Sequence, residues 1–292
     1  MARKDSSIET VFLIGAARSG TKFLRDIFSA HPDIGVIPYD INFTWRRGNE
    51  DYPDDEMSPE LCRREVSDYL RSEIPRKGRK SNSNAEIIVE KTVSNTLRIP
   101  FLLEAFPKAK FVILTRDGKP VVESAARVWT ETPSLTYRLK KLCFAGIPEW
   151  KYLWWYLRNM MTGGKREDAK PVWGPRYRGI EDDLQTEPLE VVCARQWVAC
   201  NEAILRDQET IPEDQKFQIR YEELVSDSSV LEELCDFIGL KNAETVLSRY
   251  GDSVESGMNN KWEKAFSASL LSQLSPIMNP VLSKLGYTEL RE

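Results

Sequence analysis

Short apolar runs alternate with segments of helical period along the chain. Residues 11–14 form an apolar run that ends at a glycine, and residues 22–28 place apolar side chains at helical spacing. Further strand-like runs follow at 35–38, 86–89, 110–114 and 217–221. Alternation of this kind is typical of a parallel sheet covered by helices. We therefore expect an α/β fold with a parallel central sheet flanked by helices on both faces.

Two polar stretches interrupt this pattern in the first third of the chain. Residues 46–60 are rich in turn-forming and charged side chains, which predicts a solvated loop. Residues 61–74 have helical spacing, whereas 75–84 read PRKGRKSNSN, a basic stretch rich in Ser and Asn. We interpret this stretch as a surface linker rather than a nucleic-acid-binding arm, because the chain as a whole is acidic.

The character of the chain changes between about residues 134 and 200, where tryptophans accumulate at Trp150, Trp154, Trp155, Trp173 and Trp197. This segment is too polar to form a separate core and too aromatic to be a linker. We expect a single domain over 1–292, in which 134–200 is a helical insertion or lid packed on the sheet. A Trp-rich surface could also serve a homodimer.

Composition narrows the class of protein further. The chain has 41 Lys and Arg against 45 Asp and Glu, a net charge of −4, whereas nucleic-acid binders are usually basic. No run approaches the ~18 to 20 apolar residues of a membrane span, and the start, MARKDSSIET, has no apolar signal-peptide core. Five cysteines without a CxxC pair indicate reduced thiols, and one histidine offers little for a metal site. We expect a cytoplasmic, metal-independent protein without nucleic-acid partners.

The first candidate binding motif lies between the first strand and the first helix. Gly15 and Gly20 bracket four residues there, a setting in which backbone N–H groups cradle phosphate. A nucleotide triphosphatase would continue with Gly-Lys-Ser/Thr. Here Thr21 and then Lys22 follow the second glycine, and a further cation, Arg18, lies inside the loop. The spacing predicts an anion-binding loop that differs from the Walker pattern.

A second candidate motif follows the strand at 110–114. Arg116 stands at the carboxyl end of that strand, and Ser124 follows eight residues later in the next predicted helix. Ligands of open parallel sheets bind outside the carboxyl ends of the strands. We therefore expect these two side chains to converge on a second phosphate, close to the first loop.

The two motifs together resemble those of sulfotransferases that use 3′-phosphoadenosine 5′-phosphosulfate (PAPS). Residues 15–24 are similar to the 5′-phosphosulfate loop of that family, and 115–124 to its 3′-phosphate motif. Residues 90–98 and 106–110 also match, whereas 221–224 and 260–262 match more loosely. The resemblance implies a P-loop-like sulfotransferase fold, PAPS as donor, 3′-phosphoadenosine 5′-phosphate (PAP) as product, and no metal.

The resemblance also implies roles for individual residues. The 5′-phosphosulfate would be held by Arg18, Ser19, Gly20, Thr21 and Lys22, and the 3′-phosphate by Arg116 and Ser124, with Tyr221, Lys261 and Trp262 near the nucleotide. Sulfuryl transfer is an in-line displacement in which negative charge grows on the bridging oxygen of the departing nucleotide. Cations aimed at that oxygen lower the barrier, as in phosphoryl transfer. Arg18, Lys22 and Lys91 are the candidates for this catalytic role.

The general base is less well determined by the sequence. Many members of the family use a histidine in a segment that here reads Lys91-Thr-Val-Ser-Asn95, and an asparagine cannot take a proton. Other members use a carboxylate shortly after the second strand, where this chain has Asp40. Asp40 is our candidate, although an aspartate there could also be a helix N-cap. Glu90, an acid of the predicted lid and His31 remain alternatives.

The acceptor is not determined by any motif. The aromatic region 150–197 is expected on the acceptor side, where exposed rings would suit a sugar or a cationic group. The expected acceptor is a hydroxyl or amine of a small polar natural product or a carbohydrate. Two other classes stay open: a P-loop small-molecule kinase, with Asp117 as a metal-holding acid, and a non-catalytic nucleotide-binding module.

Overall fold

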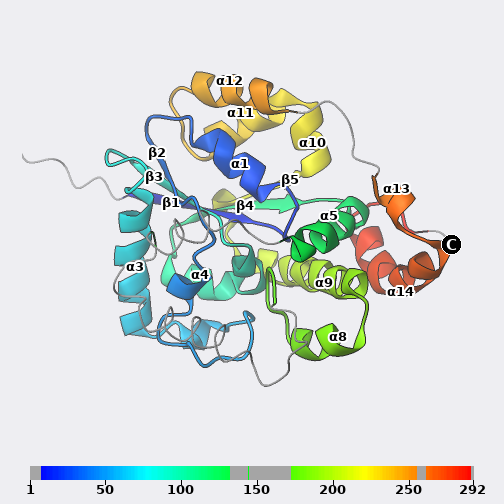
Figure 1. Cartoon of the computed structure of the whole chain (residues 1–292). Coiled ribbons are helices and arrows are strands. Elements are labelled where there is room, and N and C mark those ends of the chain that lie inside the picture. Colours follow the sequence, from blue (N-terminus) through cyan, green and yellow to red (C-terminus); the bar gives the residue numbers. More distant parts are fainter. Residues whose placement is uncertain (1–7, 132–143, 145–171, 255–260, 291–292) are drawn as a thin grey trace, which may run out of the picture.

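The computed structural model describes residues 8–131, 144, 172–254 and 261–290. Its centre is a sheet in the order β2-β3-β1-β4-β5 (Figure 1). The strands are β1 (Glu9–Ile14), β2 (Ile34–Val36), β3 (Ile87–Glu90), β4 (Lys110–Thr115) and β5 (Lys216–Arg220). All four neighbouring pairs are parallel. The predicted α/β class with a parallel central sheet is therefore confirmed.

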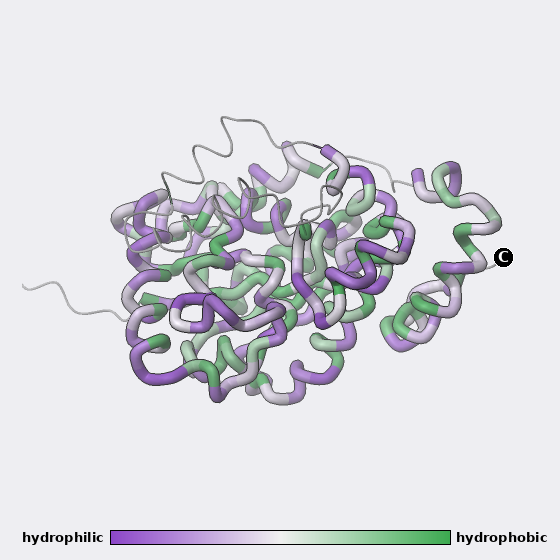
Figure 2. The backbone as a smooth tube through the Cα atoms, turned by 60° about the horizontal axis from the view of Figure 1, so that its bottom comes forward, coloured by the Kyte–Doolittle hydropathy of each residue, from purple (hydrophilic) through white to green (hydrophobic). Residues whose placement is uncertain are grey.

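The central strands are buried because helices cover both of their faces. Val11 and Leu13 of β1 point into one apolar cluster, and Phe12 and Ile14 point into another. A strand enclosed in this way is apolar at successive positions rather than alternately. Figure 2 shows this as hydrophobic segments in the interior and hydrophilic segments mainly outside.

Helices lie on both faces of the sheet. Above the sheet in Figure 1 lie α1 (Thr21–Phe28), α10 (Tyr221–Ser226), α11 (Ser228–Phe237) and α12 (Glu244–Ser253). Below it lie α3 (Arg64–Gly78), α4 (Ile99–Ala105), α8 (Ile180–Thr186) and α9 (Leu189–Asp207). A third cluster joins α9 to α5 (Gly118–Thr130) and α14 (Ala268–Lys284). Short helical segments complete the chain: α2 (Asn42–Trp45), η1 (Pro59–Leu61), η2 (Val93–Leu97), η4 (Gln208–Thr210), η5 (Glu213–Gln215) and α13 (Lys261–Ala265).

The prediction of a linker over 75–84 is wrong for its first part, because α3 continues through Pro75 to Gly78. Packing against the sheet overrides the helix-breaking residues. A Cβ on Gly78 would lie 2.5 Å from Cγ2 of Ile88, so only glycine allows this close approach of helix and strand. The preceding Lys77 is fully buried, and its Nζ lies 3.3 Å from Oε1 of Glu73.

The predicted insertion or lid over 134–200 needs a similar correction. Residues 189–200 belong to α9, which packs against α5 and α14 as part of the main core. Trp197 is 1% exposed there, and Trp173 packs against Trp129 with 5.9 Å between ring centroids. Most of the predicted lid, 134–143 and 145–171 with Trp150, Trp154 and Trp155, lies outside the described residues.

Four cysteines are described, Cys62, Cys193, Cys200 and Cys235, and all are buried and unpaired. Burial raises the pKa of each thiol, to about 11 for Cys62 and about 12 for Cys193. These thiols are therefore protonated and packed as small apolar side chains, as the sequence predicted. In the described part of the chain, no helix combines the length and hydrophobicity that crossing a membrane requires.

Candidate active site

The candidate residues gather at one edge of the sheet because every strand runs in the same direction. The loop 15–20 follows β1, Asp40 follows β2, Lys91 follows β3, Arg116 follows β4 and Tyr221 follows β5. The carboxyl ends of parallel strands share one edge, where ligands of open α/β sheets bind. The strand order places Asp40 and Lys91 on one side of the loop 15–20, and Arg116 and Tyr221 on the other.

The loop 15–20 has a backbone built for close approach to an anion. Arg18 adopts a φ of 71° and Gly20 a φ of 101°, both in the left-handed region. Side chains rarely adopt this region, and non-glycine examples concentrate at functional sites. Among the described residues no side chain caps the start of α1, and its first turn contains no acidic residue. The N–H groups of that turn are therefore available to an anion.

The two predicted phosphate motifs meet in space. Nε of Arg18 donates a hydrogen bond to Oγ of Ser124 at 2.9 Å, and Nη1 of Arg116 donates to the carbonyl of Arg18 at 3.1 Å. These contacts join residues 106 and 98 positions apart in sequence. Within the described residues, Nε of Arg116 is buried without a hydrogen-bond partner. A buried donor of this kind is costly unless a ligand or water satisfies it.

Tyr221 lies in the same group as Arg18 and Arg116. Its ring lies beside the loop: a Cβ on Gly20 would be 2.4 Å from Cδ2 of Tyr221. The guanidinium of Arg116 lies over this ring, 3.9 Å from the ring centroid, in a close cation–π contact. The glycine is therefore required both for its φ and for the space that the ring occupies. Tyr221 in turn fixes the plane of the Arg116 side chain.

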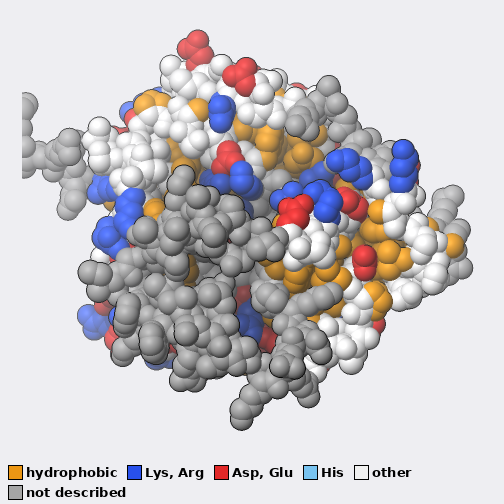
Figure 3. Space-filling view, in the orientation of Figure 1, with side chains coloured by type: hydrophobic (Ala, Val, Ile, Leu, Met, Phe, Trp, Pro, Cys, Tyr) orange, Lys and Arg blue, Asp and Glu red, His pale blue; other side chains and the backbone are white. Residues whose placement is uncertain are grey.

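The local electrostatics favour an anion at this group. Desolvation lowers the pKa of Arg18, and so do the positive charges of Arg127 and Arg116. Arg127 is partly neutralised by Glu123, 3.3 Å away, and Glu131, 3.5 Å away. Figure 3 shows Lys and Arg side chains gathered between α10 and α5, with acidic side chains beside them. Cations held this close repel one another, and a bound anion would relieve that repulsion.

The other residues of the first loop that were predicted to bind the 5′-phosphosulfate differ in burial. Ser19 and Thr21 are buried in the loop and the first turn of α1. Lys22 is exposed, and its Nζ pairs with Asp26 one turn further along α1. Pairs this exposed contribute little stability, so Lys22 can exchange Asp26 for a ligand at small cost.

The C-terminal candidates approach the site from α13. Trp262 lies next to the first turn of α5, where Nζ of Lys119 is 5.4 Å from its indole ring. It also packs on Phe266, with 6.0 Å between ring centroids. Lys261 is exposed at the start of α13, and within the described chain no contact connects it to Arg18 or Arg116.

Asp40 and Lys91 form an ion pair at the carboxyl ends of β2 and β3. Nζ of Lys91 lies 2.9 Å from Oδ1 of Asp40, with side-chain exposures of 9% and 34%. Asp40 is not a helix N-cap, because Ile41 holds that position in α2. Arg25 of α1 donates a hydrogen bond from Nη1 to the Pro38 carbonyl at 2.6 Å, which ties this loop to the helix after the anion-binding loop.

Glu90, which the sequence suggests only as an alternative base, is buried behind this pair. Glu90 is 1% exposed at the end of β3. Its carboxylate accepts hydrogen bonds from Oγ1 of Thr92 at 2.5 Å, Nδ2 of Asn95 at 2.8 Å and Nε1 of Trp45 at 3.2 Å. Burial raises the pKa of Glu90 to about 7. The only sequence signal for this arrangement was a carboxylate that ends an apolar strand.

His31 does not fit the role of base. It follows the C-terminal end of α1, and this helix runs back from the loop 15–20 toward the opposite edge of the sheet. Its Nδ1 accepts a hydrogen bond from the Asp33 N–H at 3.1 Å. Nε2 is therefore the protonated nitrogen, and it lies 2.7 Å from the carbonyl oxygen of Asn242. Both ring nitrogens are engaged in fixing the turn.

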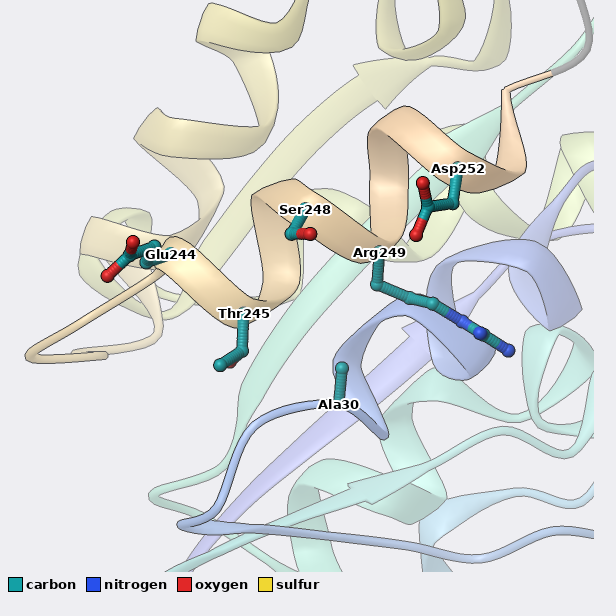
Figure 4. Close-up of a pocket in the computed structure, with 6 residues that line it drawn as sticks. All are labelled: Ala30, Glu244, Thr245, Ser248, Arg249 and Asp252. Atoms are coloured by element: carbon teal, nitrogen blue, oxygen red, sulfur yellow. The ribbon is translucent and has the colours of Figure 1, made fainter.

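Two surface grooves lie away from this edge. One, of about 420 Å³, lies between Ala30 and the residues of α12 shown in Figure 4. The other, of about 540 Å³, follows α3 and contains Arg71 and Arg76. Arg71 is held by the carbonyl of Ala105, and Arg76 by the carboxylate of Glu73. Neither groove contains a residue that the sequence analysis linked to the donor.

Comparison with known proteins points to one family. A model of the sulfotransferase family matches residues 10–172, more than half of the chain. Protein-tyrosine sulfotransferase 1 of Danio rerio is 30% identical over 125 residues, which are 39% of this chain and 34% of that protein. Protein-tyrosine sulfotransferase A of Caenorhabditis elegans is 25% identical over 39% of this chain and 32% of its own length. The chain spans less than half the length of the curated relatives it matches.

Solved structures of the same architecture support the fold. The sulfotransferase domain of the Synechococcus PCC 7002 olefin synthase superposes with a TM-score of 0.52, 17% identity and 98% coverage of both chains. The sulfotransferase of Alicyclobacillus acidocaldarius gives a TM-score of 0.52 and 17% identity, over 98% of this chain and 95% of that chain. Both superpositions extend over nearly the whole chain, well beyond the segment that the family model matches.

Proposed function

The chain belongs to the sulfotransferase family, and on that premise we propose that it transfers the sulfuryl group of PAPS to a hydroxyl or amine of its acceptor. The observation that carries the proposal is the cluster of Arg18, Ser124 and Arg116. It joins the two sequence motifs at one edge of the sheet and leaves a buried guanidinium N–H unpaired within the described residues. That donor and the close approach allowed by Gly20 fit a doubly phosphorylated nucleotide.

The proposed donor contacts divide the site into two halves. The 5′-phosphosulfate would lie on the loop 18–22 and the start of α1, where the N–H groups and two cations face it. The 3′-phosphate would lie between Arg116 and Ser124, with Tyr221 and Trp262 closer to the nucleoside. Arginine suits this role because its planar fork binds a phosphate through two parallel hydrogen bonds.

The proposed mechanism is a direct in-line transfer. The acceptor oxygen or nitrogen attacks sulfur, the bond from sulfur to the bridging oxygen breaks, and PAP leaves with the electron pair. Asp40 takes the acceptor proton, because its carboxylate is half-exposed and lies at the β2 and β3 side of the same edge. Arg18, Lys22 and Lys91 balance the charge that develops on the transferred group and on the bridging oxygen.

The acceptor is a further part of the proposal. A small polar natural product or a carbohydrate remains the primary candidate. A tyrosine hydroxyl is the second candidate, because the curated relatives are named protein-tyrosine sulfotransferases. An aromatic pair supports it: Tyr39, next to Asp40, packs on Phe144 with 5.4 Å between ring centroids. A ring of this kind is a suitable neighbour for a phenolic acceptor.

A P-loop kinase is less well supported by the residues. Asp117, the candidate metal-holding acid, caps α5 by accepting a hydrogen bond from the Lys119 N–H at 3.0 Å. Its carboxylate also lies 3.3 Å from Nζ of Lys119.

We expect the purified protein to transfer labelled sulfate from PAPS in buffer that contains EDTA. The test is an acceptor panel of small alcohols and amines, oligosaccharides and tyrosine peptides, with ATP and magnesium as the donor control. Label transferred from PAPS with EDTA present supports the proposal, and the acceptor class that is labelled decides between the two candidates. Transfer of a labelled phosphoryl group from ATP with magnesium, without transfer of labelled sulfate from PAPS, would contradict it.

A further inference from the structure

Glu90 lies behind the Asp40–Lys91 pair and is connected to each member. The connection to Lys91 is the peptide bond between them, and the connection to Asp40 runs through Thr92 and Ile41. It directly precedes Lys91 in sequence, and Oγ1 of Thr92 donates to its carboxylate at 2.5 Å. The same Thr92 oxygen accepts a hydrogen bond from the Ile41 N–H at 3.0 Å. Ile41 directly follows Asp40, so one hydroxyl connects Glu90 to the backbone of the candidate base.

These links close a ring. It runs from Glu90 through Thr92 to the backbone of Ile41, from there to Asp40, and through the 2.9 Å ion pair to Lys91. Glu90, Thr92 and Lys91 are all buried, so the ring is held by packing as well as by hydrogen bonds. Side chains locked in this way keep a catalytic pair close to one geometry.

A second set of contacts fixes Glu90 from the other side. Nδ2 of Asn95 donates to Glu90 at 2.8 Å, and Oδ1 of Asn95 accepts from Nε of Arg98 at 2.9 Å. Nη2 of Arg98 donates to Oδ1 of Asn42 at 2.6 Å, and Nδ2 of Asn42 donates to Asp55 at 2.9 Å. The chain of bonds thus spans β3, η2, α2 and the loop after α2.

We propose that Glu90 is a positioning residue. Through its hydrogen bond to Thr92, and through the Thr92 bond to the Ile41 backbone, it holds Asp40 next to Lys91 in the geometry that proton transfer requires. The inference rests on the proposed function, since it assigns Asp40 and Lys91 to the reaction. It assigns no contact with donor or acceptor to Glu90, whose carboxylate is buried and occupied by Trp45, Thr92 and Asn95.

Because Glu90 can change its charge near neutral pH, its positioning role predicts a pH dependence of kcat. Its three neighbours all donate hydrogen bonds, so they stabilise the carboxylate form. Burial and the negative charge of Asp40 act in the opposite direction, whereas the positive charge of Arg98 favours the carboxylate, and the pKa is about 7. As pH falls through about 7, Glu90 gains a proton, the hydrogen bonds to it are lost or reversed, and kcat is expected to fall.

The test compares Glu90→Gln and Thr92→Val with the unchanged protein. Glu90→Gln presents an amide N–H₂ to a pocket of donors and removes the titration, so we expect kcat to drop about 100-fold with PAP affinity retained and no inflection near pH 7. Thr92→Val removes a hydrogen bond that lowers the pKa of Glu90, so the same inflection is expected to move to higher pH. Tyr250→Phe, which removes a buried hydrogen bond to the Leu224 carbonyl elsewhere, is the matched control and should leave the pH profile unchanged.

A readout without turnover separates this inference from the proposed function. In NMR spectra, the Trp45 indole and Ile41 amide resonances are expected to titrate near pH 7, and to stop doing so in Glu90→Gln. Absence of sulfuryl transfer in the unchanged protein would refute the proposed function, yet the titration would still report the link from Glu90 to Ile41. An Ile41 amide insensitive to Glu90, or a Glu90→Gln variant with unchanged kcat and pH profile, would overturn the inference.

Discussion

Asp40→Asn is expected to lower kcat by about 10²- to 10⁴-fold, the range typical of a lost general base. Asparagine keeps the size of the side chain and one oxygen for Lys91, but it cannot accept the acceptor proton. The residues proposed to bind PAPS follow other strands of the sheet than Asp40 does. Because well-separated sites act independently, the Kd for PAP should stay within about twofold. Initial rates with saturating PAPS and calorimetric titration with PAP measure the two quantities separately.

The control for this variant is Asp51→Asn, which makes the same chemical change on an exposed loop. It should leave both kcat and the affinity for PAP unchanged. Full activity of Asp40→Asn would remove Asp40 from the mechanism and direct attention to an acid elsewhere. Loss of PAP binding together with activity would mean that the change had disturbed the fold.

Arg116→Ala is expected to abolish the preference of the site for a nucleotide with a 3′-phosphate. A hydrogen bond to a charged group contributes about 1.5 to 3 kcal/mol, so PAP should bind roughly 10- to 150-fold more weakly. Adenosine 5′-phosphate, which lacks the 3′-phosphate, should lose much less affinity. Arg116→Lys should restore little, because lysine lacks the planar fork that lies on the Tyr221 ring at 3.9 Å.

The matched control is Arg127→Ala, because Arg127 lies on the same face of the site without a hydrogen bond to Arg18 or Arg116 among the described residues. Loss of the Arg127 charge should weaken the binding of PAP and of adenosine 5′-phosphate by similar, small factors. The quantity to compare is the ratio of the two dissociation constants, measured by calorimetry for each variant. An unchanged ratio in Arg116→Ala would place the 3′-phosphate elsewhere.

The approach of the two predicted phosphate motifs to each other could be predicted from sequence because its signals are local. The glycine spacing in 15–20 indicates a loop backbone, and a strand end followed by Arg116 indicates a position at the sheet edge. Parallel strand order then brings Arg18 within 2.9 Å of Ser124.

The errors arose where tertiary packing overrides local preference. Pro75 and Gly78 favour a helix end, yet α3 continues because Gly78 lets the helix lie against Ile88. The tryptophan-rich stretch predicted a lid, yet Trp197 is buried under α5, where its indole Nε1 donates to the Arg116 carbonyl at 3.3 Å. The ring through Glu90, Thr92 and Ile41 joins separate elements, and no spacing along the chain encodes it.

Calorimetric titration of the unchanged protein with PAP, without metal and beside ATP with magnesium, tests the central claim most directly. The account predicts tight binding of PAP in the presence of EDTA, weaker binding of adenosine 5′-phosphate, and no binding of ATP that depends on magnesium. Binding of ATP with magnesium, together with indifference to the 3′-phosphate, would contradict the assignment of Arg116 and Ser124 and favour a kinase.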